Sequence, residues 1–198
     1  MNPKWERHIA ILGQSHPCVS VLLSGGLDSA ACLGFYLSQG FDAECLFFSY
    51  GQASTAREAT AAKAISLHYN VPLRSIECTG IRPPSGTEVR GRNALLLTGA
   101  LMAMNADAGI IGLGVHAGTP YSDCSDYFIR EMQRLFDLYT GGLVKIGAPF
   151  LNWSKRQIWN YGHDAGVPVT LTYSCELGRD QPCGQCPSCR DLLALNAR

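Results

Sequence analysis

The hexapeptide Ser-Gly-Gly-Leu-Asp-Ser at residues 24–29 stands between an apolar run, residues 18–23, and a helix-forming run, residues 30–37. Glycines that leave a buried strand and enter a helix let the backbone approach an anion, which the helix dipole and free N–H groups then face. Asp28 is placed to hold a divalent cation against phosphates. The spacing matches neither the Walker loop nor the dinucleotide pattern Gly-x-Gly-x-x-Gly. A phosphate-binding turn of another kind is predicted, and an ordinary strand–turn–helix is the alternative.

Apolar runs alternate with helical patterns over most of the chain. We expect strands at 18–23, 43–49, 73–77, 110–115 and 143–147, and helices at 28–39, 54–69, 93–106, 123–139 and 154–165. The strands are nearly continuous apolar runs, which is typical of a parallel sheet covered on both faces. The alternation therefore predicts an α/β fold with a doubly wound, mostly parallel sheet, whose ligands lie outside the carboxyl ends of the strands.

Two segments interrupt this alternation. Residues 79–91 contain two adjacent prolines and read as a loop, and residues 167–190 read as an irregular, cysteine-rich tail. A chain of 198 residues suffices for one domain with its own core, and no repeat or low-complexity linker divides it. We therefore expect a single domain over residues 1–198, with residues 167–198 as a C-terminal appendage.

The charges balance, with 16 Lys and Arg against 16 Asp and Glu. Such a balance argues against stable nucleic-acid binding. Charged residues precede any apolar run within the first twenty positions, and no apolar run approaches the length of a membrane span. We therefore expect neither a signal peptide nor a membrane partner, and a cytoplasmic location.

Four of the nine cysteines crowd near the C-terminus, where Cys183, Cys186 and Cys189 recur at three-residue intervals and Cys175 stands upstream. In a reducing compartment such crowding indicates a metal more often than disulfides. Four thiolates satisfy tetrahedral zinc and leave no open position. One structural Zn²⁺ per chain is therefore expected, remote from bound phosphates. An iron–sulfur cluster, which also takes four cysteines, is the less favoured alternative.

The loop at residues 24–29 resembles the pyrophosphate loop of the PP-loop ATP pyrophosphatase superfamily, whose fold is adenine nucleotide alpha hydrolase-like. With the cysteine pattern and five further segments, nearly the whole chain resembles the QueC family of 7-cyano-7-deazaguanine synthases. The segments are Ser-Tyr-Gly-Gln at 49–52, Arg-Gly-Arg-Asn at 90–93, Tyr-Ser-Asp-Cys at 121–124, Ser-Lys at 154–155 and Thr-Tyr-Ser-Cys at 172–175. The resemblance implies a ligase of queuosine biosynthesis that uses two ATP, releasing AMP and pyrophosphate. It adenylates the carboxylate of 7-carboxy-7-deazaguanine, forms the amide with ammonia and dehydrates it to the nitrile.

The resemblance also implies roles for single residues. The phosphates of ATP, with Mg²⁺, would lie on Ser24, Gly25, Gly26, Leu27, Asp28 and Ser29, and the adenine beside Tyr50, Gly51 and Gln52. The expected catalytic residues are Asp28, Arg92 and Lys155. The guanidinium of Arg92 and the ammonium of Lys155 can stabilise developing negative charge. The deazaguanine would contact Arg92, Asn93, Tyr121, Asp123 and Cys124. A helix N-cap competes as a role for Asp123, and a buried structural thiol competes for Cys124.

Departures from the family pattern concentrate on the side of the amine acceptor. Ser49 stands where the family has an aspartate, and Ser125 follows Cys124 where the family has an arginine. The loop at 114–121 is shorter than usual, lacks its acidic residue and contains His116. Loss of an anion weakens the attraction for ammonium, and a shorter loop opens the pocket to a larger amine.

Several functions therefore stay open. The first is the 7-cyano-7-deazaguanine synthase itself. The second is a divergent ligase of an anti-phage defence system that adenylates the deazaguanine and conjugates it to a protein amine. A third is a non-catalytic zinc domain that binds nucleotide. A tRNA-thiolating enzyme is less favoured, because the neutral charge offers little surface for RNA. A homodimer is also expected.

Overall fold

Five parallel strands form the central sheet of the protein, whose computed structural model describes residues 17–84, 88–116, 118–119 and 121–196. The strands are β1 (Cys18–Leu22), β2 (Asp42–Ser49), β3 (Leu73–Glu77), β4 (Gly109–Gly112) and β5 (Val144–Gly147). The helices are α2 (Leu27–Ser38), α3 (Thr55–His68), α4 (Arg92–Ala103), α5 (Asp126–Thr140), α6 (Lys155–Asp164) and α7 (Pro187–Asn196). The expected strands and helices are all present, with ends that differ by a few residues.

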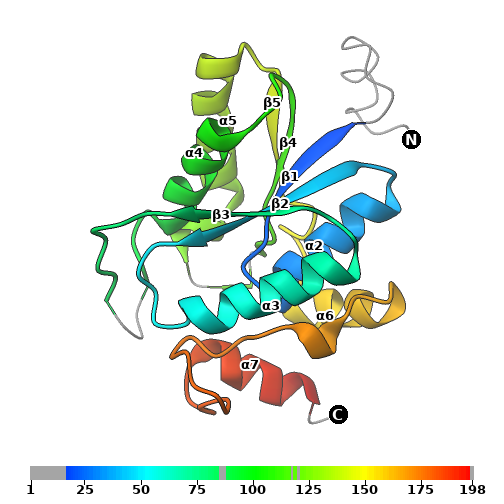
Figure 1. Ribbon diagram of the computed structural model, residues 1–198, viewed down its shortest axis with the longest axis vertical. Coiled ribbons are helices and arrows are strands. Elements are labelled where there is room, and N and C mark those ends of the chain that lie inside the picture. The colour runs from blue at the N-terminus through cyan, green and yellow to red at the C-terminus, as the bar shows by residue number, and fades with distance from the viewer. Residues whose placement is uncertain (1–16, 85–87, 117, 120, 197–198) are drawn as a thin grey trace.

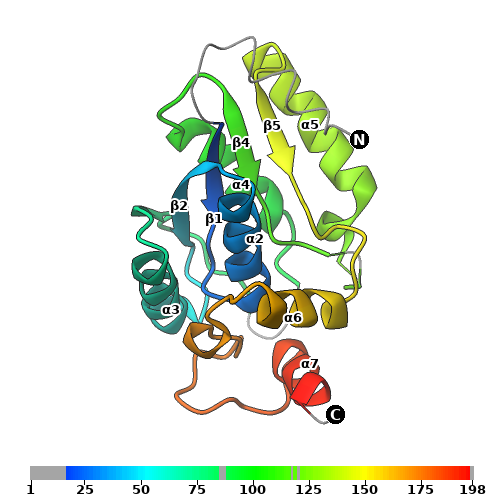
Figure 2. The same ribbon diagram turned by 90° about the vertical axis from the view of Figure 1, so that its right-hand side faces the viewer.

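The strand order β3-β2-β1-β4-β5 makes the sheet doubly wound. The chain leaves β1 through α2 and α3 to build one half, then crosses back through α4 and α5 to build the other. Figures 1 and 2 show α4 and α5 on one face of the sheet and α2 and α3 on the other. The predicted fold class is thereby confirmed. The direction of winding reverses between β1 and β4, and ligands of such sheets bind at that reversal.

Each face of the sheet packs its own apolar core. The first core joins β1 and α2 to α3 and α6 through fully buried side chains such as Leu33, Ile65 and Ile158. The second joins the opposite face to α4 and α5 through Leu97 and Phe136. Burial on both faces explains why β1 and the second half of β2 are apolar without alternation, the pattern from which a parallel sheet was predicted. The edge strands β3 and β5 carry charged residues.

Two expected boundaries are wrong for local reasons. A helix is predicted from residue 123, but α5 begins after Ser125, whose side chain accepts a hydrogen bond from the Phe128 amide, and a 3-10 turn fills Ser122–Cys124. A strand is predicted over 110–115, but β4 ends at Gly112. The chain then passes so close to the start of α2 that a Cβ on Gly114 would lie 2.5 Å from the Asp28 carbonyl oxygen. The tight approach brings the loop after β4 against the loop after β1.

The C-terminal segment contains more regular structure than the sequence suggested. Within the expected irregular tail over 167–190, residues 172–186 are irregular, but a 3-10 turn forms at Val169–Leu171 and helix α7 begins at Pro187. The tail runs along one end of the molecule, beside α3 and α6 (Figures 1 and 2). Within the described ranges, no helix has the length and apolar character needed to cross a membrane.

Candidate functional site

A cavity of about 570 Å³ lies at the carboxyl ends of the strands. In Figure 2 the arrows of β4 and β5 point toward α6 and α7. Among its walls are most of the site residues predicted from the sequence: Ser24, Gly26, Leu27, Asp28, Ser29, Tyr50, Gln52, Arg92, Asn93, Tyr121, Asp123, Cys124 and Lys155. Of the predicted residues, Gly25 and Gly51 do not line the cavity. The fold thus brings together segments that are more than a hundred residues apart in sequence.

The loop after β1 has the strained backbone that its glycines predict. Gly25 has a φ of +83°, and a Cβ at this position would lie 2.6 Å from the Glu58 carbonyl oxygen. The buried Ser29 hydroxyl donates to the Gly26 carbonyl oxygen at 3.0 Å and accepts from the Ser24 amide at 3.2 Å. Ser29 therefore shapes the loop from inside, while the Ser24 side chain is exposed.

The first turn of α2 is left open toward the cavity. Gly26 is the N-cap residue and no side chain caps the helix. The first amides of a helix have no partner four residues earlier, so they are available to an anion. Leu27 is buried and can contribute only its backbone to such an anion. The geometry is that of a phosphate-binding helix N-terminus.

Asp28 and Lys155 pair directly. The Lys155 Nζ lies 2.7 Å from each carboxylate oxygen of Asp28, and the two side chains are 28% and 22% exposed respectively. His116 approaches from the loop after β4, with its Nε2 3.8 Å from Asp28 Oδ2. The three residues come from the starts of α2 and α6 and from the loop after β4. They form the charged centre of the cavity.

The segment after β2 folds around Gln52. Its side chain accepts from the Tyr50 amide at 2.8 Å and donates to the Phe48 carbonyl oxygen at 3.0 Å and to Glu58 at 3.1 Å. Gly51 has a φ of +87° and lies against the Ile81 carbonyl oxygen. Gln52 therefore holds the loop shape, and Tyr50 is the member of the predicted adenine segment whose side chain remains available.

Arg92 begins α4 on the opposite wall. Its Nε donates to Asn93 Oδ1 at 3.2 Å. Burial raises the pKa of the Tyr50 hydroxyl, and the nearby Arg92 guanidinium opposes that rise. The guanidinium thus lies between Tyr50 and the start of α4, where an anionic ligand could bind it.

Asp123 does act as a helix cap, but on α4 rather than on the helix that follows it. Its Oδ2 accepts from the Asn93 backbone amide at 3.2 Å, and the Asn93 side chain donates back to the Asp123 carbonyl oxygen at 3.0 Å. Both residues are buried. Burial also raises the pKa of the neighbouring Cys124 thiol, against the effect of a hydrogen bond with Thr119. These contacts tie the loop after β4 to the start of α4.

Acidic residues that the sequence analysis missed also line the cavity. They are Glu58, Glu88, Glu176 and Asp191. Burial raises the pKa of the Tyr121 hydroxyl, and Glu176 is the next contributor to that rise. The cavity therefore offers carboxylates even though the loop at 114–121 lacks the family's acidic residue.

One wall of the cavity comes from the tail and from α7. It includes Ser188, Asp191, Leu192 and Leu195. These positions follow the spacing i, i+3, i+4, i+7 of one helix face. Two of the four side chains are polar, so no apolar periodicity marked this helix face in the sequence, and the cysteine pattern suggested an irregular segment.

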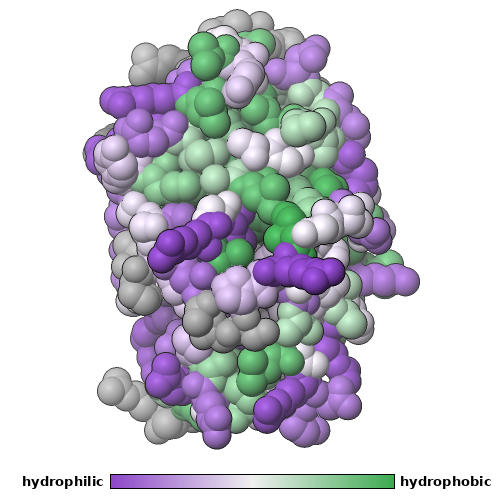
Figure 3. Space-filling view, turned by 90° about the vertical axis from the view of Figure 1, so that its left-hand side faces the viewer, coloured by the Kyte–Doolittle hydropathy of each residue, from purple (hydrophilic) through white to green (hydrophobic). Residues whose placement is uncertain are grey.

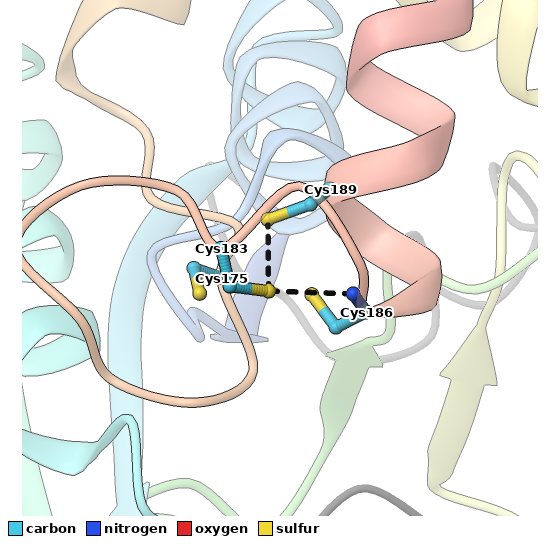
Figure 4. Close-up of side chains that lie close together, drawn as sticks. All are labelled: Cys175, Cys183, Cys186 and Cys189. Atoms are coloured by element: carbon cyan, nitrogen blue, oxygen red, sulfur yellow. Dashed lines mark hydrogen bonds between the residues drawn. The ribbon is translucent and has the colours of Figure 1, made fainter.

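The four tail cysteines converge as predicted (Figure 4). Their sulfur atoms all lie within 4.8 Å of one another, and the Cys183 and Cys189 sulfurs are 3.9 Å apart. A zinc tetrahedron with Zn–S bonds of about 2.3 Å has S···S edges of about 3.8 Å. Cys175, Cys183, Cys186 and Cys189 thus fit a closed four-thiolate site. These four cysteines form no disulfide, so the cluster is not a pair of disulfides.

The backbone prepares this cluster for a cation. Burial raises the pKa of the Cys175 thiol, but backbone hydrogen bonds from Cys183, Leu177 and Arg179 outweigh it and lower the pKa to about 6. The amides of Gln185 and Cys186 donate to the Cys183 sulfur at 3.5 and 3.3 Å and lower its pKa as well. Amides aimed at sulfur thus favour the thiolate, the form that binds metal, at these two cysteines, whereas burial raises the pKa of the Cys189 thiol to about 12.

The cluster is less separate from the cavity than the sequence suggested. The Tyr173 amide, two positions before Cys175, donates to the Gly25 carbonyl oxygen at 2.9 Å. At the other end of the tail, the Arg156 guanidinium donates to the carbonyl oxygens of Ala194 and Leu195 at 2.9 and 3.1 Å. The cysteine site therefore connects to the phosphate loop through Tyr173 and to α6 through α7.

The surface toward which β2 and β3 end is mixed in polarity. In Figure 1 the arrows of β2 and β3 point to the left, and Figure 3 shows the molecule from that side. Hydrophilic side chains cross the middle of this face, and hydrophobic ones lie above and below them.

A doubly wound sheet with an open glycine turn after β1 defines the adenine nucleotide alpha hydrolase-like class. Solved structures of this class are similar in fold at low identity. A U34-tRNA thiolase from Methanococcus maripaludis, which carries a [4Fe-4S] cluster, has a TM-score of 0.52 at 14% identity over 82% of this chain and 63% of its own. A 4-thiouridine synthetase with bound ATP has a TM-score of 0.51 at 16% identity over 90% and 49%.

The proteins similar in sequence indicate a narrower family than the structures similar in fold. The model of the queuosine biosynthesis protein QueC matches residues 18–85 and 80–194. The 7-cyano-7-deazaguanine synthase of Aquifex aeolicus is 33% identical, covering 89% of this chain and 94% of the relative. The 7-cyano-7-deazaguanine synthase 2 of Desulfitobacterium hafniense is 35% identical over 85% and 84%. The chain belongs to the QueC family.

Proposed function

We propose that this protein is a 7-cyano-7-deazaguanine synthase, an ATP-dependent ligase. The observation that carries the proposal is the Asp28–Lys155 pair beside the open N-terminus of α2, in a chain about one-third identical to curated synthases over most of its length. An anion-binding helix end, a carboxylate and an ammonium group in one cavity suit the activation of a carboxylate by ATP.

The phosphates of ATP would lie on the turn at residues 24–29, where the amides that begin α2 face the cavity. Asp28 would hold Mg²⁺, which neutralises phosphate charge and orients the leaving pyrophosphate when bound. Lys155 would face the charge that develops at the α-phosphorus. Tyr50 would lie along the adenine, with Gln52 holding its loop in place.

The deazaguanine carboxylate would be the nucleophile toward the α-phosphorus, and pyrophosphate would leave. Ammonia would then displace AMP to form the amide, and a second ATP would activate the amide oxygen for loss as AMP, which gives the nitrile. Arg92 would bind the carboxylate or the phosphate through paired donors. The buried Asn93–Asp123 pair would shape the floor beneath the substrate, because its hydrogen bonds join α4 to the loop after β4.

The cysteine cluster would hold one structural Zn²⁺. The support is the donor set itself: four convergent sulfurs with the spacing of a zinc tetrahedron and amides that favour the thiolate. Four protein ligands leave no open position for substrate, so the ion would organise the tail rather than take part in the reaction.

The acceptor is proposed to be ammonia. The family's acidic residue is missing from the loop at 114–121, which favours a bulkier amine. However, Glu88, Glu176 and Asp191 line the same cavity and can supply the negative charge that attracts ammonium. Transfer to a protein amine, as in the defence-type ligases, is therefore the second candidate and an outcome of the experiment.

The experiment is incubation of the pure protein with ATP, 7-carboxy-7-deazaguanine and ammonium, with products identified by mass. Nitrile formation that keeps pace with two ATP consumed is the expected result. AMP release without nitrile would contradict the ammonia assignment and favour the larger acceptor. Absence of AMP would overturn the ligase proposal and leave a nucleotide-binding zinc domain.

A further inference from the structure

His116 is a buried side chain of the charged centre. The phosphate-binding role proposed for the turn at residues 24–29 does not explain its function. It belongs to the loop after β4, while Asp28 belongs to the turn after β1. These two strands are neighbours where the winding of the sheet reverses. The fold therefore places His116 and Asp28 opposite each other at the position where such sheets bind ligands.

The hydrogen bonding of the ring decides which nitrogen carries the proton. The Gly118 amide donates to His116 Nδ1 at 3.2 Å, so Nδ1 acts as an acceptor. A neutral imidazole that accepts at Nδ1 carries its hydrogen on Nε2. Nε2 is the nitrogen that lies 3.8 Å from Asp28 Oδ2, and the side chain is only 5% exposed. His116 thus presents an N–H donor to Asp28 and cannot accept a proton at that atom.

Burial supports the neutral form. It lowers the pKa of His116, and the nearby Lys155 charge lowers it too, while Asp28 and Asp191 oppose both effects. The charged groups around the ring are therefore those two carboxylates and the Lys155 ammonium.

The Lys155 ammonium has two competing partners, the Asp28 carboxylate and the phosphates of ATP. It now bonds both oxygens of Asp28 at 2.7 Å. In the proposed reaction the same ammonium faces the phosphates. When Lys155 turns away, the cation compensates the charge of Asp28, but a carboxylate oxygen that does not bind the cation loses its hydrogen-bond donor, which is costly in a half-buried cavity.

We infer that His116 is a positioning residue for Asp28, donating its Nε2–H to the carboxylate once Lys155 engages phosphate. The inference rests on the proposed function, because it takes the cavity to be the site of Mg²⁺ and ATP. The required approach is small: 3.8 Å must shorten to a normal hydrogen-bond length of about 2.9 Å. The donor then holds Asp28 in a defined orientation toward the cation.

Two substitutions separate this role from a purely structural one. His116→Gln keeps an N–H donor at about the reach of Nε2 and gives up the acceptor next to the backbone. His116→Asn places an acceptor near Nδ1, which keeps the contact with Gly118, but lacks the reach to Asp28. His163→Asn serves as the matched control, because His163 lies in the last turn of α6 against Trp159.

The measurement is calorimetric binding of α,β-methylene-ATP with and without Mg²⁺, after thermal melting has shown that each variant is folded. Addition of Mg²⁺ should strengthen binding to the wild type, His116→Gln and His163→Asn alike. His116→Asn should lose about tenfold of that gain, the order expected for one hydrogen bond to a charged group.

The opposite pattern, in which His116→Asn behaves as wild type and His116→Gln loses the gain, would show that His116 only holds its loop and would overturn the inference. Equal Mg²⁺ dependence in all variants would also overturn it. Absence of nucleotide binding by the wild type is a distinct result, which would overturn the proposed function and this inference with it.

Discussion

The Lys155 ammonium lies 2.7 Å from both carboxylate oxygens of Asp28, although the two residues are 127 positions apart in the chain. The sequence analysis predicted separate roles for them, Asp28 toward the cation and Lys155 toward the phosphates. In the structure each is the other's partner. In the proposed reaction, binding of ATP with its cation would exchange this ion pair for contacts with the ligand, so the strength of the pair would influence nucleotide affinity.

Replacement of Asp28 by alanine should abolish ATP turnover and leave the fold intact. The side chain is at the helix start and partly exposed, so little packing is lost. Loss of metal-positioned phosphates should reduce AMP release by about 10²-fold or more. The control is Asp137→Ala, which breaks an exposed pair with Lys145. AMP release at the wild-type rate in Asp28→Ala would show that the assignment is wrong.

Substitution of Cys186 by serine should remove the zinc and destabilise the tail. Metal analysis should give one zinc per chain for the wild type and for Cys78→Ser, whose cysteine lies outside the cluster. Cys186→Ser should retain little zinc, and its melting temperature should fall by about 5 °C or more, because metal loss is among the largest single destabilisations. Stoichiometric iron–sulfur absorbance in the wild type would contradict the zinc prediction.

Metal and nucleotide should stabilise each other's binding. Tyr173 links the tail to Gly25, and α7 forms a wall of the cavity, so the two sites share structural elements. Coupling between two binding sites is reciprocal. α,β-Methylene-ATP should therefore slow the transfer of zinc to a chromophoric chelator.

The variant Arg156→Ala tests the route of this coupling, since Arg156 holds the carbonyl end of α7. The nucleotide should protect zinc less in this variant than in Arg134→Ala, which alters an exposed pair on α5. Zinc transfer at the same rate with and without nucleotide in the wild type would mean that the cysteine site is independent of the cavity.

The capping box of α6 is exposed, but we expect it to contribute measurably to the free energy of unfolding. The Ser154 side chain accepts from the Gln157 amide, and the Gln157 side chain accepts from the Ser154 amide. Ser154→Ala should lower the free energy of unfolding by about 1 kcal/mol, measured by urea denaturation. Thr60→Ala, on the exposed face of α3, is the control. An unchanged unfolding midpoint in Ser154→Ala would show that the box does not stabilise the start of α6, where Lys155 lies.

Features encoded by neighbouring residues were predictable. The turn at residues 24–29 combines glycines with a preceding apolar run, and its anion-binding geometry follows from short-range backbone constraints. The same holds for the cysteine cluster, because three of its four ligands recur at fixed spacing. Helix α7 was not predicted, because its cavity face combines Ser188 and Asp191 with Leu192 and Leu195 and so shows no apolar periodicity.

Roles that depend on a distant partner were less accessible. Asp123 was recognised as a possible helix cap, but the helix that it caps begins at Arg92, which precedes it in the chain. Which helix it caps is decided by the packing of α4 against the loop after β4. A local pattern contains no information on that packing.

By itself, the sequence determined the α/β class, the glycine turn after β1 and the cysteine cluster, because each follows from periodicity or spacing within a short segment. The tertiary structure decided that Asp28 pairs with Lys155, that His116 faces the same carboxylate and that α7 walls the cavity. These relationships arise where the sheet reverses its winding and brings the ends of β1 and β4 together. They depend on side-chain contacts between segments far apart in the chain, which only the folded molecule defines.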